Sequence, residues 1–249
     1  MEFLLLGGLA VRGPAGTVVH PPRLKHRQLL AALLLEANRP VPAARLIEAL
    51  WGAHAPESAA QNLKTYIWAL RRLFADIGLD RAAIHTQAGG YRLDVPADGI
   101  DLTVFRRLTA QARQAMRAGD ARTAHEGLCR ALALWRGEAL QDARGTDLLD
   151  SAATALDEER LIAAEELTEA ALALGLYTEV ITEARAMLKE HPLRERPWAQ
   201  LMLALHRSGQ TADALAAYRE LRRITIEELG VEPGPLARQT HQRILTEGP

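Results

Sequence analysis

The sequence predicts a mainly α-helical protein of 249 residues, with a mixed α+β part followed by an all-α part. Strand-like apolar runs occur near the N-terminus, whereas apolar patterns of helical period fill the chain from Asp101 onward. The length favours two domains, since single domains usually contain roughly 100–200 residues. We therefore expect one domain over residues 1–97 and a second over residues 98–249.

The first part contains strands and helices in a clear order. An apolar run is followed by a Gly-Pro-Ala-Gly turn and a short valine-containing segment, which together predict a strand pair. Two segments of helical period come next, and glycine or proline lies just beyond each of them. The expected elements are strands at 2–11 and 17–19, a helix at Leu24–Ala37 and a helix at Ala43–Leu50.

A third helix, Ser58–Asp76, has two contrasting faces. At about 100° of rotation per residue, one narrow stripe is apolar and the opposite face is polar and cationic. The stripe consists of Leu63, Ile67, Leu70 and Phe74; the opposite face carries Gln61, Thr65, Trp68 and Arg72, with Lys64 and Arg71 on one flank. A major-groove reading helix needs this division, because cations hold phosphates and short polar groups contact base edges. The alternative is an ordinary solvated amphipathic helix.

Two short strands after this helix predict a hairpin. The segments 83–86 and 91–93 flank a turn at Gln87-Ala88-Gly89-Gly90. A hairpin directly after the third helix is the arrangement of a winged helix-turn-helix, in which the wing can reach the adjacent minor groove. We therefore expect a winged helix in the first domain, with Gln87 and Arg92 on its wing.

The second part predicts helices only. The helical patterns lie at Val104–Met116, Ala121–Trp135, Leu148–Leu174, Leu176–Leu188, Trp198–His206, Ala212–Leu229 and Leu236–Leu245. Gly175 and Gly209 are 34 residues apart, and apolar positions such as Val180 and Ala214 match at that offset. This is the period of tetratricopeptide repeats, whose stacked helix pairs form grooves for protein ligands. A generic helical bundle is the alternative.

Charge and motifs exclude several classes of protein. Residues 1–97 hold 11 lysines and arginines against 7 acidic residues, and residues 98–249 hold 19 against 24. This uneven charge favours a nucleic-acid module joined to a protein-binding one.

Cys129 is the only cysteine, which favours a reducing cytoplasm. No phosphate-binding loop, dinucleotide fingerprint or zinc-protease motif occurs. We expect no enzyme, no cofactor, no metal site and no membrane span, because the apolar runs are shorter than the ~20 residues that cross a bilayer.

Several strings, taken in order, resemble the Streptomyces antibiotic regulatory proteins, which are transcriptional activators of actinobacteria. They are Asn38-Arg39-Pro40-Val41, Leu46-Ile47, Leu50-Trp51-Gly52, Asn62-Leu63-Lys64-Thr65-Tyr66-Ile67, Leu70-Arg71-Arg72, Gly90-Tyr91-Arg92-Leu93, Ala131-Leu132-Ala133-Leu134-Trp135-Arg136-Gly137 and Glu227-Glu228-Leu229-Gly230-Val231-Glu232-Pro233-Gly234. The resemblance covers nearly the whole chain. It implies a winged helix of the response-regulator output type and a tetratricopeptide-like bacterial transcriptional activation domain. The chain ends soon after Pro233-Gly234, so we expect the small form, without the ATPase that some relatives append.

The resemblance implies a pathway-specific activator of secondary-metabolite (antibiotic) biosynthesis, located in the cytoplasm and associated with the nucleoid. Such a protein binds double-stranded DNA in a promoter and recruits RNA polymerase holoenzyme. A function from another class is a helical-repeat adaptor between proteins, whose N-terminal domain is only a basic structural module. Salt-dependent binding to duplex DNA distinguishes the activator from the adaptor. A protein that neutralises DNA phosphates loses affinity for the duplex as the salt concentration rises.

The expected DNA contacts follow from side-chain chemistry. Gln61, Thr65, Trp68 and Arg72 contact base edges, Lys64 and Arg71 hold phosphates, and Gln87 and Arg92 act from the wing. Two roles have alternatives, because Trp68 can instead pack against the second domain and Arg92 can brace the hairpin. Related winged helices often carry a base-reading arginine where this chain has Ala69. One protomer therefore offers few base contacts, and we expect a homodimer on tandem direct repeats.

Overall fold

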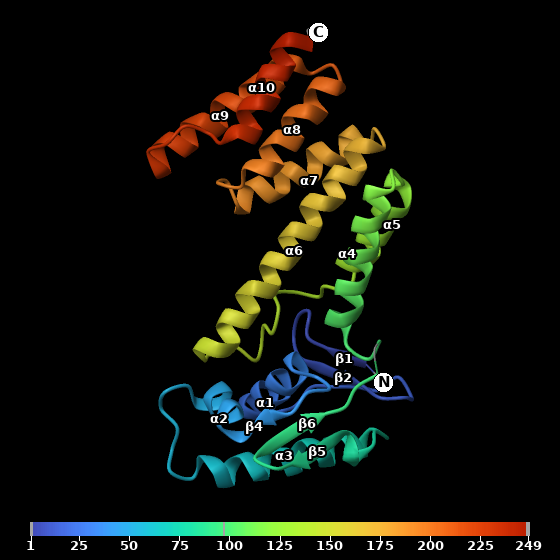
Figure 1. The fold of residues 1–249 in the computed structure, drawn as a ribbon, viewed down its shortest axis with the longest axis vertical. Coiled ribbons are helices and arrows are strands. Elements are labelled where there is room, and N and C mark those ends of the chain that lie inside the picture. Colours follow the sequence, from blue (N-terminus) through green and yellow to red (C-terminus); the bar gives the residue numbers. More distant parts are fainter. Residues whose placement is uncertain (1, 97, 248–249) are drawn as a thin grey trace. The chain divides into compact units, whose positions relative to one another are not determined.

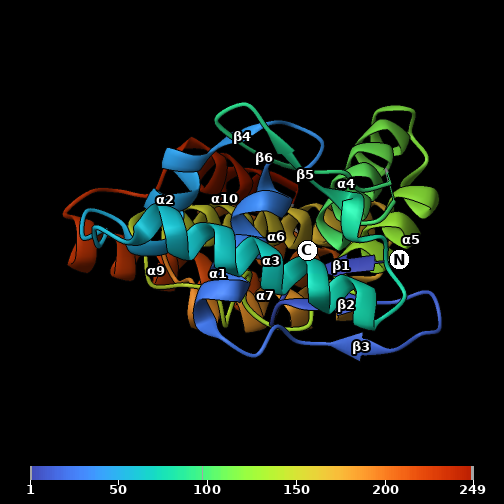
Figure 2. The same ribbon diagram turned by 90° about the horizontal axis from the view of Figure 1, so that it is seen from below.

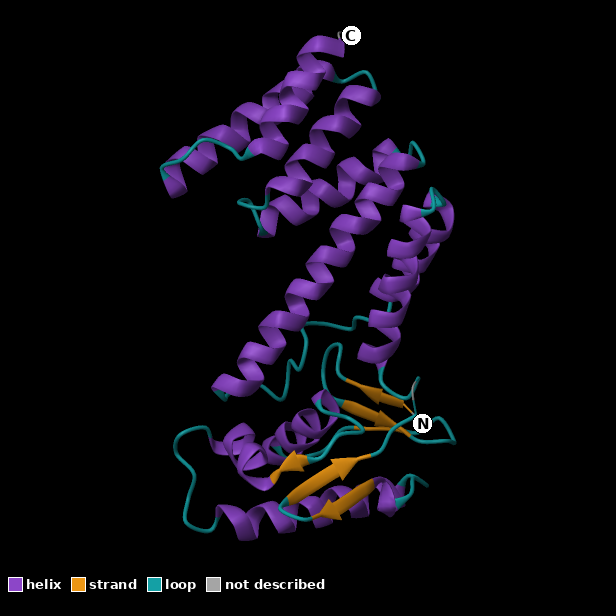
Figure 3. Ribbon diagram, viewed as in Figure 1, coloured by secondary structure: helices purple, strands orange, loops and turns teal. Residues whose placement is uncertain are grey.

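The computed structural model describes residues 2–96 and 98–247 (Figure 1). Helices make up most of it, and the strands of the described residues all precede residue 94 (Figure 3). The chain divides into two compact units: unit 1 contains Met1–Leu108 and Arg130–Arg160, and unit 2 contains Thr109–Cys129 and Leu161–Pro249. The predicted fold class, a small α+β winged helix followed by an all-α part, is confirmed.

The N-terminal apolar run forms two strands, whereas the sequence predicts one. The strands of this sheet are β1 (Glu2–Leu4), β2 (Ala10–Arg12) and β3 (Val18–Val19), antiparallel in the order β1-β2-β3. The run reverses around Gly7, whose φ of +134° is a conformation that residues with a Cβ rarely adopt. Leu5, Leu6 and Leu9 in this turn are fully buried, so the turn belongs to the core.

The three predicted helices are confirmed. They are α1 (Leu24–Leu35), α2 (Ala43–Trp51) and α3 (Ala59–Asp76). Figure 2 views this part from the side of α3, with α1 behind it. Gly52 follows α2 with a φ of +58°, as expected for a glycine that ends a helix. The helices share an apolar core with the N-terminal sheet, in which the ring centroids of Phe3 and Phe74 lie 5.6 Å apart.

The predicted wing is confirmed and includes a third strand. After the short 3-10 helix η1 (Arg81–Ala83), β5 (Ile84–Gln87) and β6 (Gly90–Leu93) form the hairpin, and β4 (Val41–Pro42) pairs with β6. The sheet order is therefore β4-β6-β5. The turn is formed by Ala88 and Gly89 and not by the two glycines. Gly90 lies within β6, where a Cβ would come within 2.1 Å of the Val41 carbonyl oxygen.

From residue 28 to residue 34, helix α1 is buried around its whole circumference. Residues 28–34 are all buried, including the polar Gln28. Gln28 Nε2 donates to the Arg144 carbonyl oxygen at 3.2 Å, and Gln28 Oε1 accepts from Lys25 Nζ at 3.0 Å. A helix without a polar face needs neighbours on every side. Helices α2 and α3 supply some of them, and residues 136–146 supply others.

We call residues 136–146 the covering segment, because within unit 1 they lie along the β1–β2 turn and the first two helices. Its hydrogen bonds to them include Arg136 N to Leu6 O (2.8 Å), Leu140 N to Leu5 O (3.0 Å), Leu9 N to Asp142 Oδ1 (2.7 Å), Arg27 Nε to Asp142 O (2.7 Å) and Thr146 Oγ1 to Ala49 O (3.0 Å). Leu140 is fully buried with a φ of +51°, an uncommon conformation for a residue with a Cβ. Its burial and its hydrogen bond hold it there.

A buried carboxylate joins residue 101 to the β1–β2 turn. Asp101 is only 6% exposed. Its side chain accepts hydrogen bonds from the backbone amides of Leu5 (2.8 Å), Leu6 (3.0 Å) and Leu102 (2.8 Å), and Arg136 Nη2 lies 3.3 Å away. Burial raises the pKa of Asp101, and the hydrogen bonds and Arg136 oppose that rise. The carboxylate is thus the acceptor for several buried donors.

Seven helices complete the chain as described, and they confirm the predicted helical segments. They are α4 (Asp101–Arg117), α5 (Ala121–Leu132), α6 (Asp147–Ala173), α7 (Tyr177–Glu190), α8 (Glu195–Arg207), α9 (Thr211–Leu229) and α10 (Pro235–Glu247). None of the helices in residues 2–96 and 98–247 has the length and apolar character needed to cross a bilayer.

The 34-residue repeat has a structural counterpart in unit 2. Helices α7 and α9 each begin two residues after a glycine with positive φ, Gly175 (+75°) and Gly209 (+82°). The matched residues Val180 and Ala214 are both fully buried. Around Trp198 in α8, residues of α7, α9 and α10 form one apolar core. The repeat is therefore a pair of packed helices.

Candidate nucleic-acid interface

Helix α3 places its apolar stripe in the core as predicted. Leu63, Ile67, Leu70 and Phe74 are all at most 1% exposed. The helix begins after Pro56 and Glu57, and the Asn62 side-chain amide donates to Ser58 Oγ at 3.1 Å near its first turn. No glycine or proline interrupts it. The buried stripe fixes the rotation of the helix about its axis, and so determines which side chains face outward.

Five of the predicted DNA-contacting side chains are exposed on the outer face of α3. They are Gln61, Lys64, Thr65, Trp68 and Arg72. Trp68 is 60% exposed. The Arg72 guanidinium lies 5.7 Å from the centroid of the Trp68 ring, within reach of a cation–π interaction. We call these five residues the outer face of α3.

Arg71 points to the wing. Its Nε and Nη2 donate to the Ile84 carbonyl oxygen at 3.0 and 2.6 Å, and Nη2 also donates to Thr86 Oγ1 at 2.9 Å. Its side chain therefore lies against β5 and apart from the outer face of α3. The phosphate contact expected of Arg71 stays a prediction.

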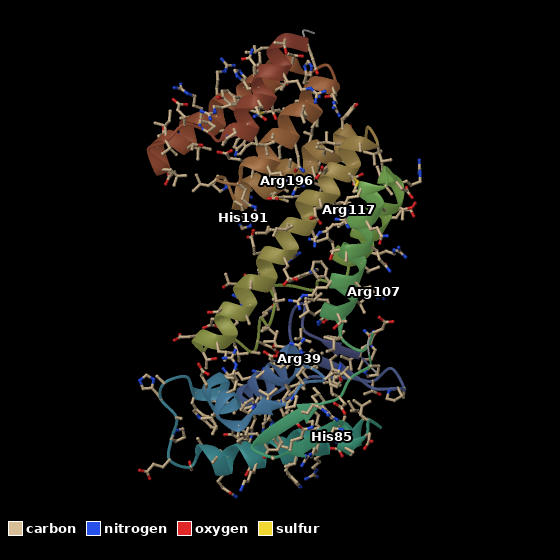
Figure 4. The ribbon with its side chains drawn as sticks, viewed as in Figure 1. Arg39, His85, Arg107, Arg117, His191 and Arg196 are labelled. Atoms are coloured by element: carbon tan, nitrogen blue, oxygen red, sulfur yellow. The ribbon has the colours of Figure 1, made fainter. Side chains whose placement is uncertain are left out.

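On the wing, Arg92 pairs within the hairpin. Arg92 Nε lies 2.6 Å from Asp94 Oδ1, and His85 Nε2, on β5 (Figure 4), lies 3.0 Å from Asp94 Oδ2. The hydrogen bond from Arg92 lowers the pKa of Asp94. This geometry agrees with the alternative that Arg92 braces the hairpin. Gln87 is half-buried at the end of β5, next to the turn at Ala88.

Two residues near the outer face of α3 were missed by the sequence reasoning. Arg23 and His26, at the start of α1, line a groove of about 370 Å³ together with Trp68, Ala69 and Arg72. Burial and the neighbouring Arg23 charge lower the pKa of His26, which favours the neutral imidazole. The sequence held one sign of these two residues, because the start of α1 is cationic and directly follows two prolines. Only the fold shows that it borders α3.

The outer face of α3 is suited to a polyanion with exposed polar edges. Residues 58–75 contain three cations and no acidic residue. The amide and guanidinium groups of Gln61 and Arg72 can form paired hydrogen bonds with purine edges, and Lys64 can neutralise a phosphate. In the described part of the chain, no group of three or more metal-ligating side chains was found.

Comparison with known proteins matches both parts of the chain. Residues 22–93 match the family described as transcriptional regulatory protein, C terminal, and residues 100–245 match the bacterial transcriptional activator domain. The chain is 36% identical to the regulatory protein DnrI of Streptomyces peucetius, with 100% of this chain and 93% of DnrI covered. It is 35% identical to the transcriptional regulator RedD of Streptomyces coelicolor, with 90% of this chain and 65% of RedD covered.

A solved structure extends the likeness to the fold. The structure of Mycobacterium tuberculosis EmbR in complex with a low-affinity phosphopeptide matches with a TM-score of 0.95 at 36% identity, covering 100% of this chain and 65% of that one. The chain therefore spans slightly less than two thirds of EmbR and of RedD.

Proposed function

The chain belongs to the Streptomyces antibiotic regulatory protein family of transcriptional regulators, and we propose that it is a sequence-specific DNA-binding activator of a secondary-metabolite pathway. The outer face of α3 is the observation that carries this proposal. Five side chains able to contact bases or phosphates are exposed on one helix, and the opposite stripe is held in the core. Such a helix can enter the major groove without rearranging its own packing.

Substitutions on the outer face of α3 test DNA binding. Arg72→Ala is expected to weaken binding at the preferred site by about 1–3 kcal/mol, because a base-edge contact is lost. Lys64→Ala is expected to weaken binding to all duplexes alike and to reduce the salt slope by about 1, because one phosphate contact is lost. Fluorescence anisotropy at several salt concentrations measures both effects.

Matched controls come from unit 2, where Lys189 on α7 and Arg219 on α9 are also exposed. Lys189→Ala and Arg219→Ala each remove one positive charge, as the α3 substitutions do, but they remove it from unit 2. We expect them to leave both the affinity and the salt slope unchanged. If the α3 variants bind as tightly as the parent chain, DNA recognition by α3 is wrong.

We further propose that two protomers bind tandem direct repeats. The small Ala69 leaves the outer face of α3 with few base-reading groups, so a second protomer raises affinity through effective concentration. Repeats about 10–11 base pairs apart would place both helices on one side of the duplex. Inserting about half a helical turn between the repeats is therefore expected to abolish cooperative binding in a gel-shift titration. Cooperative binding that survives this insertion would contradict the head-to-tail dimer.

The all-α part is proposed to contact RNA polymerase holoenzyme. Residues 98–249 carry more acidic than basic residues, which disfavours non-specific DNA contact, and packed repeat helices provide surfaces for proteins. Run-off transcription from a direct-repeat promoter measures recruitment directly. The alternative role as a helical adaptor predicts no effect on transcription and no salt-dependent duplex binding. As an activator, the protein would act in the cytoplasm, associated with the nucleoid.

A further inference from the structure

Arg71 links α3 to the wing at a specific place on β5. Its guanidinium makes hydrogen bonds to the Ile84 carbonyl oxygen and to Thr86 Oγ1. Ile84 is buried at the start of the strand, and the Thr86 side chain is exposed further along it. One rigid, planar group therefore contacts two residues of the hairpin.

The Ile84 carbonyl is available to Arg71 because β5 is an edge strand. The sheet order β4-β6-β5 leaves one side of β5 without a strand. The Asp94 amide donates to the Ala83 carbonyl oxygen across the hairpin. Since backbone groups in an antiparallel pair alternate between the partner strand and the outside, the next carbonyl, that of Ile84, points to the open edge. Arg71 satisfies this carbonyl and thereby fixes the edge of the wing to α3.

We propose that Arg71 is a positioning residue that sets the wing at a defined angle to α3, so that both can contact one DNA duplex at the same time. This inference rests on the proposed function. A wing already ordered against α3 does not have to be immobilised on binding. The entropic cost of ordering it therefore does not reduce the favourable free energy of binding. Arg71 would act through the geometry of the domain and not through a phosphate.

Lysine is the informative replacement. Arg71→Lys keeps the charge but replaces the planar fork with one compact ammonium group, which cannot bridge Ile84 and Thr86 in the same way. Thr86→Val removes the side-chain acceptor on the wing and changes no charge. A phosphate contact would tolerate lysine, whereas a positioning contact would not.

Two measurements on the full chain test the proposal. In the first, nitroxide labels are attached at Ala60→Cys on α3 and Ala88→Cys on the wing, both exposed positions, in a Cys129→Ser background. Electron-spin distance measurements are expected to give a narrow distribution, which broadens with Arg71→Lys and, to a smaller extent, with Thr86→Val. An unchanged distribution overturns the inference, whatever the protein binds.

The second measurement is duplex affinity at two salt concentrations. Arg71→Lys is expected to bind about tenfold more weakly with the same salt slope, and the further loss caused by Gln87→Ala is expected to be smaller than in the parent chain. Parent-like binding by Arg71→Lys, together with a salt slope reduced by about 1 in Arg71→Met, would identify a phosphate contact and overturn the positioning role. If the parent chain binds no duplex, the proposed function fails. The label distances then still decide whether Arg71 orders the wing.

Discussion

A fragment that ends at residue 97 is expected to lose the cooperative unfolding transition of the full chain. The cut removes Asp101 and the covering segment, so α1 loses neighbours along residues 28–34 and the β1–β2 turn loses its hydrogen-bond partners. Hydrogen bonds of this kind contribute about 0.5–1.5 kcal/mol each, and domains of this size are stable by only about 5–15 kcal/mol. Thermal unfolding followed by circular dichroism checks the prediction.

A longer fragment is the control. Residues 1–160 contain every residue of unit 1, so this fragment is expected to unfold cooperatively. The comparison separates loss of the covering segment from loss of unit 2. A cooperative transition in the 1–97 fragment at the melting temperature of the full chain would show that the winged helix does not depend on the covering segment.

Asp101→Ala is expected to lower the free energy of unfolding by about 3–5 kcal/mol. The substitution leaves the buried amides of Leu5 and Leu6 without their acceptor. It also removes the carboxylate partner of Arg136, whose side chain is 36% exposed. Buried donors without partners cost about 1–3 kcal/mol each, which accounts for an effect of this size. Urea denaturation at neutral pH measures the change.

Asp98→Ala is the matched control for Asp101. Its side chain is 70% exposed and lies 3.2 Å from Arg107 Nη2, so the loss of this surface pair is expected to cost at most about 0.5–1 kcal/mol. Equal effects of the two substitutions would mean that the buried hydrogen bonds of Asp101 contribute nothing beyond an exposed ion pair.

The helices and the face of α3 could be predicted because both depend on local periodicity. The apolar stripe through Leu63 and Phe74 determines which residues face outward, and no distant part of the chain is needed to infer this. The seven consecutive buried residues of α1 also had an indication in the sequence, since the run Leu29–Leu34 has no polar position. That run predicts neighbours on all sides of the helix.

The partners of individual charged side chains could not be predicted. Arg71 lies on the flank of α3, and only the distance between the helix and β5 determines that its guanidinium reaches the Ile84 carbonyl oxygen. Strand β4 has two residues, one of them proline, and it is a strand only because it pairs with β6. The covering segment has no regular period at all. Its role follows from tertiary contacts with residues more than a hundred positions earlier.

The covering segment also limits how regulators of this family can be recombined. A chimera joined at residue 97 would combine the N-terminal part of one protein with the covering segment of another, and contacts such as Leu9 with Asp142 would have to survive between unrelated partners. For the promoter recognition that we propose for α3, grafting is the better route to a new specificity. The outer face of α3 can be exchanged residue by residue in an intact scaffold, because its side chains point away from the core that the covering segment completes.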